Sequence, residues 1–137
     1  MSFLLDTNVI SELRLGAKAD RNVLAWRASY APDDLFLSVV TIGEVRKGAE
    51  EARPKDPRKA AIFERWLGFL ELEFESRILD ITPEIAGLWG RVVARSKILP
   101  LDCFIAATAA HYGYTVVTRN DRDFRKTGVD SINPFKI

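Results

Sequence analysis

The chain has 137 residues, close to the length of one average domain, so we expect a single domain over residues 1–137. Hydrophobic residues make up 47% of the chain and charged residues 28%, a globular composition that excludes a disordered, collagen-like or wholly coiled-coil protein. Twenty Lys and Arg against nineteen Asp and Glu leave a net charge of +1. Nucleic-acid binding would therefore have to come from local basic patches and not from a global positive field.

The sequence contains no segment typical of secretion or membrane insertion. The first apolar run, residues 3–5, is interrupted by Asp6 and is too short for the core of a signal peptide. Nowhere do the roughly eighteen consecutive apolar residues of a membrane span occur. With Cys103 as its single cysteine, the chain cannot form an internal disulfide. We expect a soluble, cytoplasmic protein without a membrane partner.

Apolar runs and helical periodicities alternate along the chain. The run 3–5 lacks polar alternation, which favours a strand buried on both faces, and further strands are predicted at 35–40, 77–81 and 114–118. Helices are expected directly after Asp6, over 20–30, from 41 to about 52, over 58–74, from Pro83 onward, and from Asp102 until Gly113 stops it. This order predicts an α/β fold: a parallel β-sheet flanked by helices, with a helical hairpin insertion near residues 41–74.

Acidic residues stand where predicted strands pass into helices. Asp6 follows the first strand, Glu44 comes shortly after the second, Asp102 opens a helix, and Asp121 or Asp123 follows the last strand. The carboxyl ends of parallel strands form the ligand crevice of such sheets, so we expect these acids to converge. Clustered carboxylates repel one another unless they bind a hard cation such as Mg²⁺ or Mn²⁺. Each acid taken alone is also explained as a helix cap.

Four motifs in a fixed order strengthen the functional interpretation. They are Asp6-Thr7-Asn8 after a strand, Thr41-x-x-Glu44 after a strand, Leu99-Pro100-x-Asp102 opening an alanine-rich helix, and Thr118-Arg119-Asn120 followed by Asp123-Phe124. In this order the chain, from Phe3 to Phe135, resembles the PIN-domain ribonucleases, specifically the VapC-like toxins of type II toxin-antitoxin pairs and their FitB-like branch. The resemblance implies a PIN-like fold and endonucleolytic cleavage of RNA with Mg²⁺ or Mn²⁺.

The resemblance also assigns residues and partners. It implies that Asp6 and Asp102 are metal ligands and that Glu44 supports the same metal, and it leaves Asn120, Asp121 and Asp123 open for the fourth acidic position. Thr7, Asn8, Thr118 and Arg119, with Asn120, are expected to hold the carboxylates or to touch substrate, although Thr7 could equally cap a helix. The implied partners are RNA, a VapB-like antitoxin, a second copy of the chain, and operator DNA in a larger toxin-antitoxin complex.

The residues themselves favour hydrolysis by metal-activated water. The only histidine, His111, lies near a predicted helix end, where interaction with the helix dipole is the simpler role. Residues 46–65 carry a net charge of +3, which suits an RNA backbone or an ordinary solvated face. The apolar residues of the helices 20–30 and 58–74 predict a homodimer. The antitoxin that the resemblance implies is expected to place an arginine against Asp6, Glu44 or Asp102 in competition with metal. Its apolar helix is expected to cover the groove beside Trp26 and the region 46–65.

Three other functions are compatible with parts of this pattern. A receiver-type signalling domain is also a single α/β domain with an acidic metal pocket, but it needs an acid pair after the first strand and a lysine after the last, whereas Arg119 follows Thr118 here. An inactive PIN-like nucleic-acid-binding module is favoured if Asn120 replaces the fourth ligand. A nuclease of RNA processing would share the chemistry without being a toxin.

Overall fold

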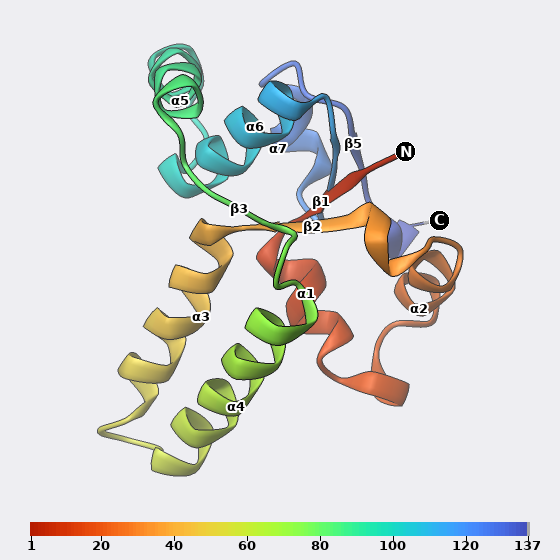
Figure 1. The fold of residues 1–137 in the computed structure, drawn as a ribbon, viewed down its shortest axis with the longest axis vertical. Coiled ribbons are helices and arrows are strands. Elements are labelled where there is room, and N and C mark those ends of the chain that lie inside the picture. The colour runs from red at the N-terminus through yellow and green to blue at the C-terminus, as the bar shows by residue number, and fades with distance from the viewer. Residues whose placement is uncertain (137) are drawn as a thin grey trace.

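The architecture is a small parallel sheet between two layers of helices (Figure 1). The computed structural model describes residues 1–136. The strand order is β3-β2-β1-β4-β5, and every pairing in the sheet is parallel. The strands are β1 (Phe3–Leu5), β2 (Leu35–Ser38), β3 (Ile78–Leu79), β4 (Thr115–Val117) and β5 (Ser131–Ile132). The predicted α/β class with a parallel sheet is confirmed.

The helices divide between the two faces of the sheet. One face carries α1 (Thr7–Leu13), α2 (Arg21–Ala28), α3 (Val39–Ala52) and α4 (Pro57–Glu73) (Figure 1). The other carries α5 (Pro83–Arg95), α6 (Pro100–Tyr112) and α7 (Asp121–Arg125). Short 3-10 turns occupy Gly16–Lys18, Pro32–Asp34 and Pro134–Lys136. Within residues 1–136, no helix combines the length and apolar content that crossing a membrane requires.

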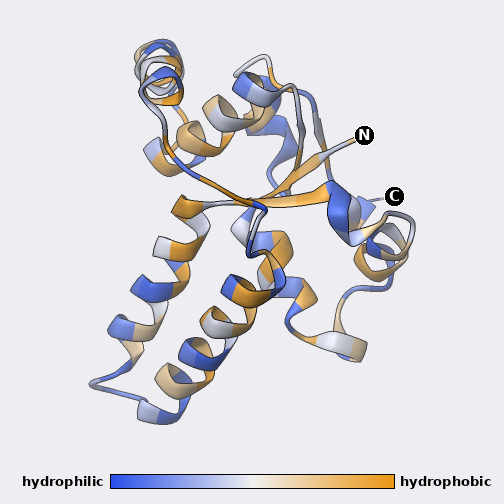
Figure 2. Ribbon diagram, viewed as in Figure 1, coloured by the Kyte–Doolittle hydropathy of each residue, from blue (hydrophilic) through white to orange (hydrophobic). Residues whose placement is uncertain are grey.

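The central strand β1 explains the uniform apolar run at the start of the chain. Phe3, Leu4 and Leu5 are all buried, because β2 and β4 flank the strand and helices cover both faces. Phe3 and Leu5 belong to the core under α1, α2 and α4, whereas Leu4 points into the core under α6 and α7. Figure 2 shows this central band as hydrophobic, with hydrophilic residues on the outer sides of the helices. β1 is thus fixed from both sides.

Local capping fixes several helix starts as predicted. The Asp20 carboxylate accepts hydrogen bonds from the backbone N–H groups of Asn22 and Val23 and begins α2. The Thr82 hydroxyl caps α5, with Pro83 in its first turn. α6 ends at Gly113, whose φ of +73° is left-handed and favours glycine. The predicted helical hairpin is present as α3 and α4, and a Cβ at Gly48 would lie 2.9 Å from the Phe63 ring, so the two helices approach closely there.

Several predicted boundaries were wrong for identifiable reasons. The second strand ends at Ser38 and not at Val40, because the Ser38 hydroxyl accepts a hydrogen bond from the Val40 N–H and begins α3 two residues earlier. α6 begins at Pro100 and not at Asp102, so Asp102 lies in the first turn and is not the cap. The strands β3 and β4 are shorter than predicted. The short elements α7 and β5 were not predicted at all.

Candidate active site

Three parallel strands end at one edge of the sheet and bring four sequence motifs together. Asp6 directly follows β1, Thr118 directly follows β4, and Ser38 at the end of β2 leads into α3, which carries Glu44. The first turn of α6 adds Asp102 at the same edge. The register that pairs Leu5 with Val117 places the residues after β1 and β4 side by side. We call this set of carboxylates and its hydroxyl partners the acidic opening.

Asp6 is buried and held by three donors. Its side chain is 4% exposed; Oδ1 accepts from the Thr7 N–H at 2.8 Å, and Oδ2 accepts from the Thr118 hydroxyl at 2.8 Å and from Asn8 Nδ2 at 3.3 Å. Burial raises the pKa of Asp6, and these hydrogen bonds oppose that rise by stabilising the charged form. Asp6 therefore caps α1, as the simpler interpretation expected, and is also fixed from β4 across the sheet.

Glu44 is oriented by a pair of threonine hydroxyls. The Thr7 hydroxyl donates to Glu44 Oε1 at 2.7 Å and lies 3.1 Å from the hydroxyl of Thr41, which is fully buried. Because a hydroxyl has one proton, Thr7 donates to Glu44 and accepts from Thr41. Burial raises the pKa of Glu44, the Thr7 hydrogen bond lowers it, and the charge of Asp6 raises it. Thr7 thus links α1 to α3 through the carboxylate.

Asp102 lies within electrostatic range of the other acids. Partial burial, followed by the charges of Asp6, Glu44 and Asp123, raises the pKa of Asp102 to about 6. Asp123, the acid before Phe124, is half-buried, and its Oδ1 lies 3.6 Å from Lys126 Nζ. Of the candidates for the fourth acid, Asp123 is the one whose charge contributes to the raised pKa of Asp102.

Asp121 and Asn120, the other two candidates for the fourth acidic position, have different surroundings from Asp123. The Asp121 carboxylate is paired with Arg125 and accepts from Asn133 Nδ2 at 3.4 Å, so both of its oxygens serve the local structure of α7. Asn120 is exposed and its side chain does not cap α7, but its N–H donates to the Thr118 hydroxyl at 2.9 Å. The Arg119 N–H donates to Asn8 Oδ1 at 3.1 Å, while its guanidinium lies 3.9 Å from the centre of the Phe135 ring. These contacts fix the loop after β4.

The donor set suits a hard divalent cation. Carboxylate and hydroxyl oxygens are the ligands that Mg²⁺ and Mn²⁺ prefer, and the raised pKa values of Asp6, Glu44 and Asp102 reflect negative charge held in a partly dry opening. Among residues 1–136, no three Asp, Glu, His or Cys side chains are close enough, as placed here, to bind one ion jointly. Joint binding would therefore require side-chain movement.

The Asp102 pKa predicts a pH-dependent stability. Its folded value of about 6 lies above its ordinary 3.8, so the folded state binds this proton more tightly, and metal-free stability falls as pH rises between these values. The full shift corresponds to about 3 kcal/mol, which we discount to about 1 kcal/mol because the group is half-exposed. In EDTA, Asp102→Asn should lose less stability than the parent between about pH 4 and pH 7.5. If the melting temperatures of the parent and of Asp102→Asn changed equally with pH over this range, the prediction would be wrong.

The sequence did not reveal the roles of two residues that organise the site. Thr41 was recognised only as the first residue of the motif Thr41-x-x-Glu44, although its helical spacing places it on the same helix face as Glu44. Asn133 donates to the Arg119 carbonyl oxygen at 3.1 Å and accepts from the Phe135 N–H at 2.9 Å, which ties the loop after β4 to the end of the chain. No local sequence pattern predicts this role of Asn133, because the role depends on the position of β5.

Other predicted surfaces are changed by the fold. Trp26 is buried in the core against Phe3 and so does not line a groove. In the basic region 46–65, Arg46 and Arg53 form ion pairs with glutamates of the same hairpin, Glu50 and Glu64. The apolar residues that remain exposed on α4 are Ile62, Phe69 and Leu72. The homodimer predicted from these helices stays a prediction, with less exposed apolar surface than the sequence suggested.

Comparison with known proteins identifies the family. The PIN domain family matches residues 3–130. The chain is 36% identical to VapC ribonuclease Y4jK of Sinorhizobium fredii over 97% of each chain, and 33% identical to Toxin FitB of Neisseria gonorrhoeae over 96% of this chain and 97% of that one. The crystal structure of FitAcB from Neisseria gonorrhoeae superimposes with a TM-score of 0.85 at 31% identity, covering 98% of this chain and 99% of that one. A structure of FitAB bound to an IR36 DNA fragment gives a TM-score of 0.84 at 31% identity, over 98% and 96%. The chain therefore belongs to the PIN-domain family, in the branch that contains the VapC and FitB toxins.

Proposed function

We propose that this protein is the endoribonuclease toxin of a toxin-antitoxin pair and that it hydrolyses RNA with Mg²⁺ or Mn²⁺ held by Asp6, Glu44 and Asp102. The observation that carries the proposal is that these acids, from three different motifs, lie within electrostatic range of one another at one edge of a PIN-domain sheet. A divalent cation bound there would neutralise phosphate charge and lower the pKa of a water molecule. In-line attack by that water would leave a 3′-hydroxyl and a 5′-phosphate.

The residues around the opening have separate tasks in this proposal. Thr118 and Asn8 hold Asp6, and Thr7 holds Glu44, so that both carboxylates stay oriented. Asp123 supplies the fourth negative charge. Histidine chemistry is disfavoured because His111 is nine residues along α6 from Asp102, a rise of about 14 Å. The chain's own groups therefore position an ion and a phosphate and leave the proton transfer to water.

The direct test is incubation of the purified protein with total RNA in Mg²⁺, in Mn²⁺ and in EDTA. We expect fragments with 5′-phosphate and 3′-hydroxyl ends in either metal and none in EDTA, and end-mapping distinguishes these from the cyclic phosphates that histidine-type ribonucleases leave. Survival of every RNA in both metals would contradict the enzymatic proposal and would favour an inactive binding module.

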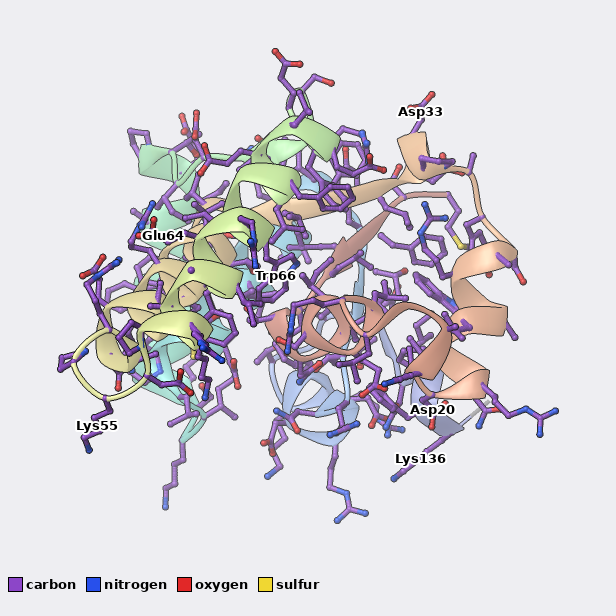
Figure 3. All side chains as sticks on the ribbon, turned by 90° about the horizontal axis from the view of Figure 1, so that it is seen from below. Asp20, Asp33, Lys55, Glu64, Trp66 and Lys136 are labelled. Atoms are coloured by element: carbon purple, nitrogen blue, oxygen red, sulfur yellow. The ribbon has the colours of Figure 1, made fainter. Side chains whose placement is uncertain are left out.

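The antitoxin is proposed to bind beside the acidic opening. An apolar groove of about 330 Å³ lies between α1, α2 and α4, with Leu13, Trp66 and Phe69 among its lining residues and Arg14 and Arg27 also bordering it. Figure 3 shows Trp66 on the side of α4 that faces α1. This groove, and not the surface near Trp26, suits an amphipathic antitoxin helix. An arginine that comes after this helix in the antitoxin chain and reaches into the acidic opening would compete with the cation for the carboxylates.

Growth measurements separate a toxin from a nuclease of RNA processing. Expression of the chain alone in a bacterial host should arrest growth, and co-expression of its VapB-like antitoxin should restore it. The Asp6→Asn variant, which lacks one carboxylate of the opening, should permit growth at equal protein level. Growth unaffected by the active parent would leave the nuclease proposal standing and remove the toxin role.

A further inference from the structure

A second groove lies on the opposite layer of helices, between α5 and the turn that follows α7. We call it the α5–α7 groove. Its volume is about 440 Å³, and Leu88 and Val92 contribute apolar surface to it. Arg91 and Arg95 stand one helical turn apart on α5, and Lys126 and Thr127 line the groove from the end of α7. Cations therefore border this groove from two separate elements.

The two arginines of this groove have no neutralising partner among the described residues. Residues 85–101 contain Arg91, Arg95 and Lys97 and no acidic residue. Within the part of the chain that the structure describes, Arg91 and Arg95 take part in no ion pair, whereas Arg46 and Arg53 of the α3–α4 hairpin are paired with glutamates. Arg91, Arg95 and Lys126, the three cations that line the groove, are all exposed. An anionic ligand would not have to break an internal ion pair to reach the two arginines.

One end of the groove adjoins the acidic opening. Lys126 Nζ lies 3.6 Å from Asp123 Oδ1, so the lysine connects the groove to an acid of the opening. On the other wall, the Ser96 hydroxyl lies 3.6 Å from the sulfur of Cys103, the residue directly after Asp102. The groove thus reaches the first turn of α6, which also carries Asp102, on one wall and the Lys126–Asp123 ion pair on the other. A chain of phosphates lying in the groove would lead into the opening.

We propose that the α5–α7 groove binds the phosphodiester backbone of the RNA through Arg91, Arg95 and Lys126 and guides the strand to the acidic opening. This inference rests on the proposed ribonuclease function and names where that substrate is held. Because the contacts are made to phosphates, they add affinity without sequence preference, and they compensate the repulsion between RNA and the carboxylates. The tip of the α3–α4 hairpin, which carries Lys55 and Arg58, is assigned no role in holding the strand.

The test compares two variants that each remove two positive charges. Arg91→Gln with Arg95→Gln changes the groove, and Lys55→Gln with Arg58→Gln changes the exposed far tip of the α3–α4 hairpin, where Figure 3 shows Lys55. Both pairs are made in the full-length Asp6→Asn background to prevent cleavage. Binding to a labelled single-stranded RNA of mixed sequence is then measured by fluorescence anisotropy at several salt concentrations, and thermal melting confirms that each variant is folded.

The groove variant should bind RNA about tenfold more weakly near 0.1 M salt, with the slope of log K against log salt reduced in magnitude by about 1.4 for two lost phosphate contacts. The hairpin variant should bind like its parent, and Lys126→Gln should show about half the groove effect. Unchanged binding by the groove variant, or an equal loss in the hairpin variant, would overturn the proposal.

In the cleaving background the groove variant should raise KM and keep kcat. Cleavage of RNA by the unaltered protein is scored separately, so failure of the nuclease proposal is distinguishable from failure of the groove.

Discussion

Asp102→Asn should reduce RNA cleavage by at least about a hundredfold while leaving the fold intact. The substitution keeps the size of the side chain but removes a negative charge that burial and three neighbouring acids make costly. The loss should therefore appear in kcat measured at saturating Mn²⁺, and calorimetric titration should show weaker Mn²⁺ binding. Far-UV circular dichroism like that of the parent and a melting temperature no lower than that of the parent would confirm that folding is not the cause.

The control for this variant is Asp121→Asn. Asp121 is also an acid near the end of β4, but its oxygens are occupied by Arg125 and Asn133. Its loss should cost some stability through α7 and should leave Mn²⁺ affinity close to that of the parent. If Asp121→Asn abolishes Mn²⁺ binding and Asp123→Asn does not, the fourth acid has been assigned to the wrong residue.

Thr7→Val should lower kcat/KM by about ten- to a hundredfold, which is the usual range for residues that orient a ligand. Valine matches the shape of threonine but removes the donor to Glu44 and leaves the buried Thr41 hydroxyl without its partner. The Mn²⁺ concentration needed for half-maximal activity should rise, because Glu44 is no longer held. Single-turnover cleavage at several Mn²⁺ concentrations measures both changes.

Thr7→Ser distinguishes this orienting role from packing. Serine keeps the hydroxyl that reaches Glu44 and loses only a methyl group, so its activity should lie within a few-fold of the parent. A serine variant as impaired as the valine variant would show that the methyl group, and not the hydrogen bond, matters at this position. Unfolding in urea provides the independent measure of stability for both variants.

The sequence predicted the architecture because its signals are local. The uniform apolar run Phe3–Leu5, the Asp20 cap and the stop at Gly113 each depend on a few neighbouring residues. The boundary at Ser38 was missed because its two following valines have strand propensity, which the cap overrides. β5 was missed because two residues carry no periodicity, and they form a strand only where β4 is already in place.

The candidate site was partly predictable for a related reason. The positions of Asp6 and Glu44 follow from the rule that parallel strands end at a common edge, whereas Asp102 follows α5 in the chain and reaches the site through the first turn of α6. Which of Asp121 and Asp123 faces that edge is decided by the ion pair of Asp121 with Arg125, one turn along a helix that the sequence did not reveal. The threonine pair at Glu44 likewise depends on the contact between α1 and α3. Thr7 is separated from Thr41 by 34 positions in the sequence and from Glu44 by 37.

The hydrogen bond between the Thr118 hydroxyl and Asp6 has a consequence for the timing of synthesis. It joins residues 112 positions apart, and the β1–β4 pairing that supports it has a similar separation. A ribosome adding about 5–20 residues per second needs roughly 6 to 22 seconds to make the segment between them. Until β4 has left the ribosome, Asp6 lacks its partner and the sheet edge is incomplete. During that time the nascent chain carries β1, α1 and α3 without an assembled opening, and the proposed ribonuclease site forms only after β4 has been made.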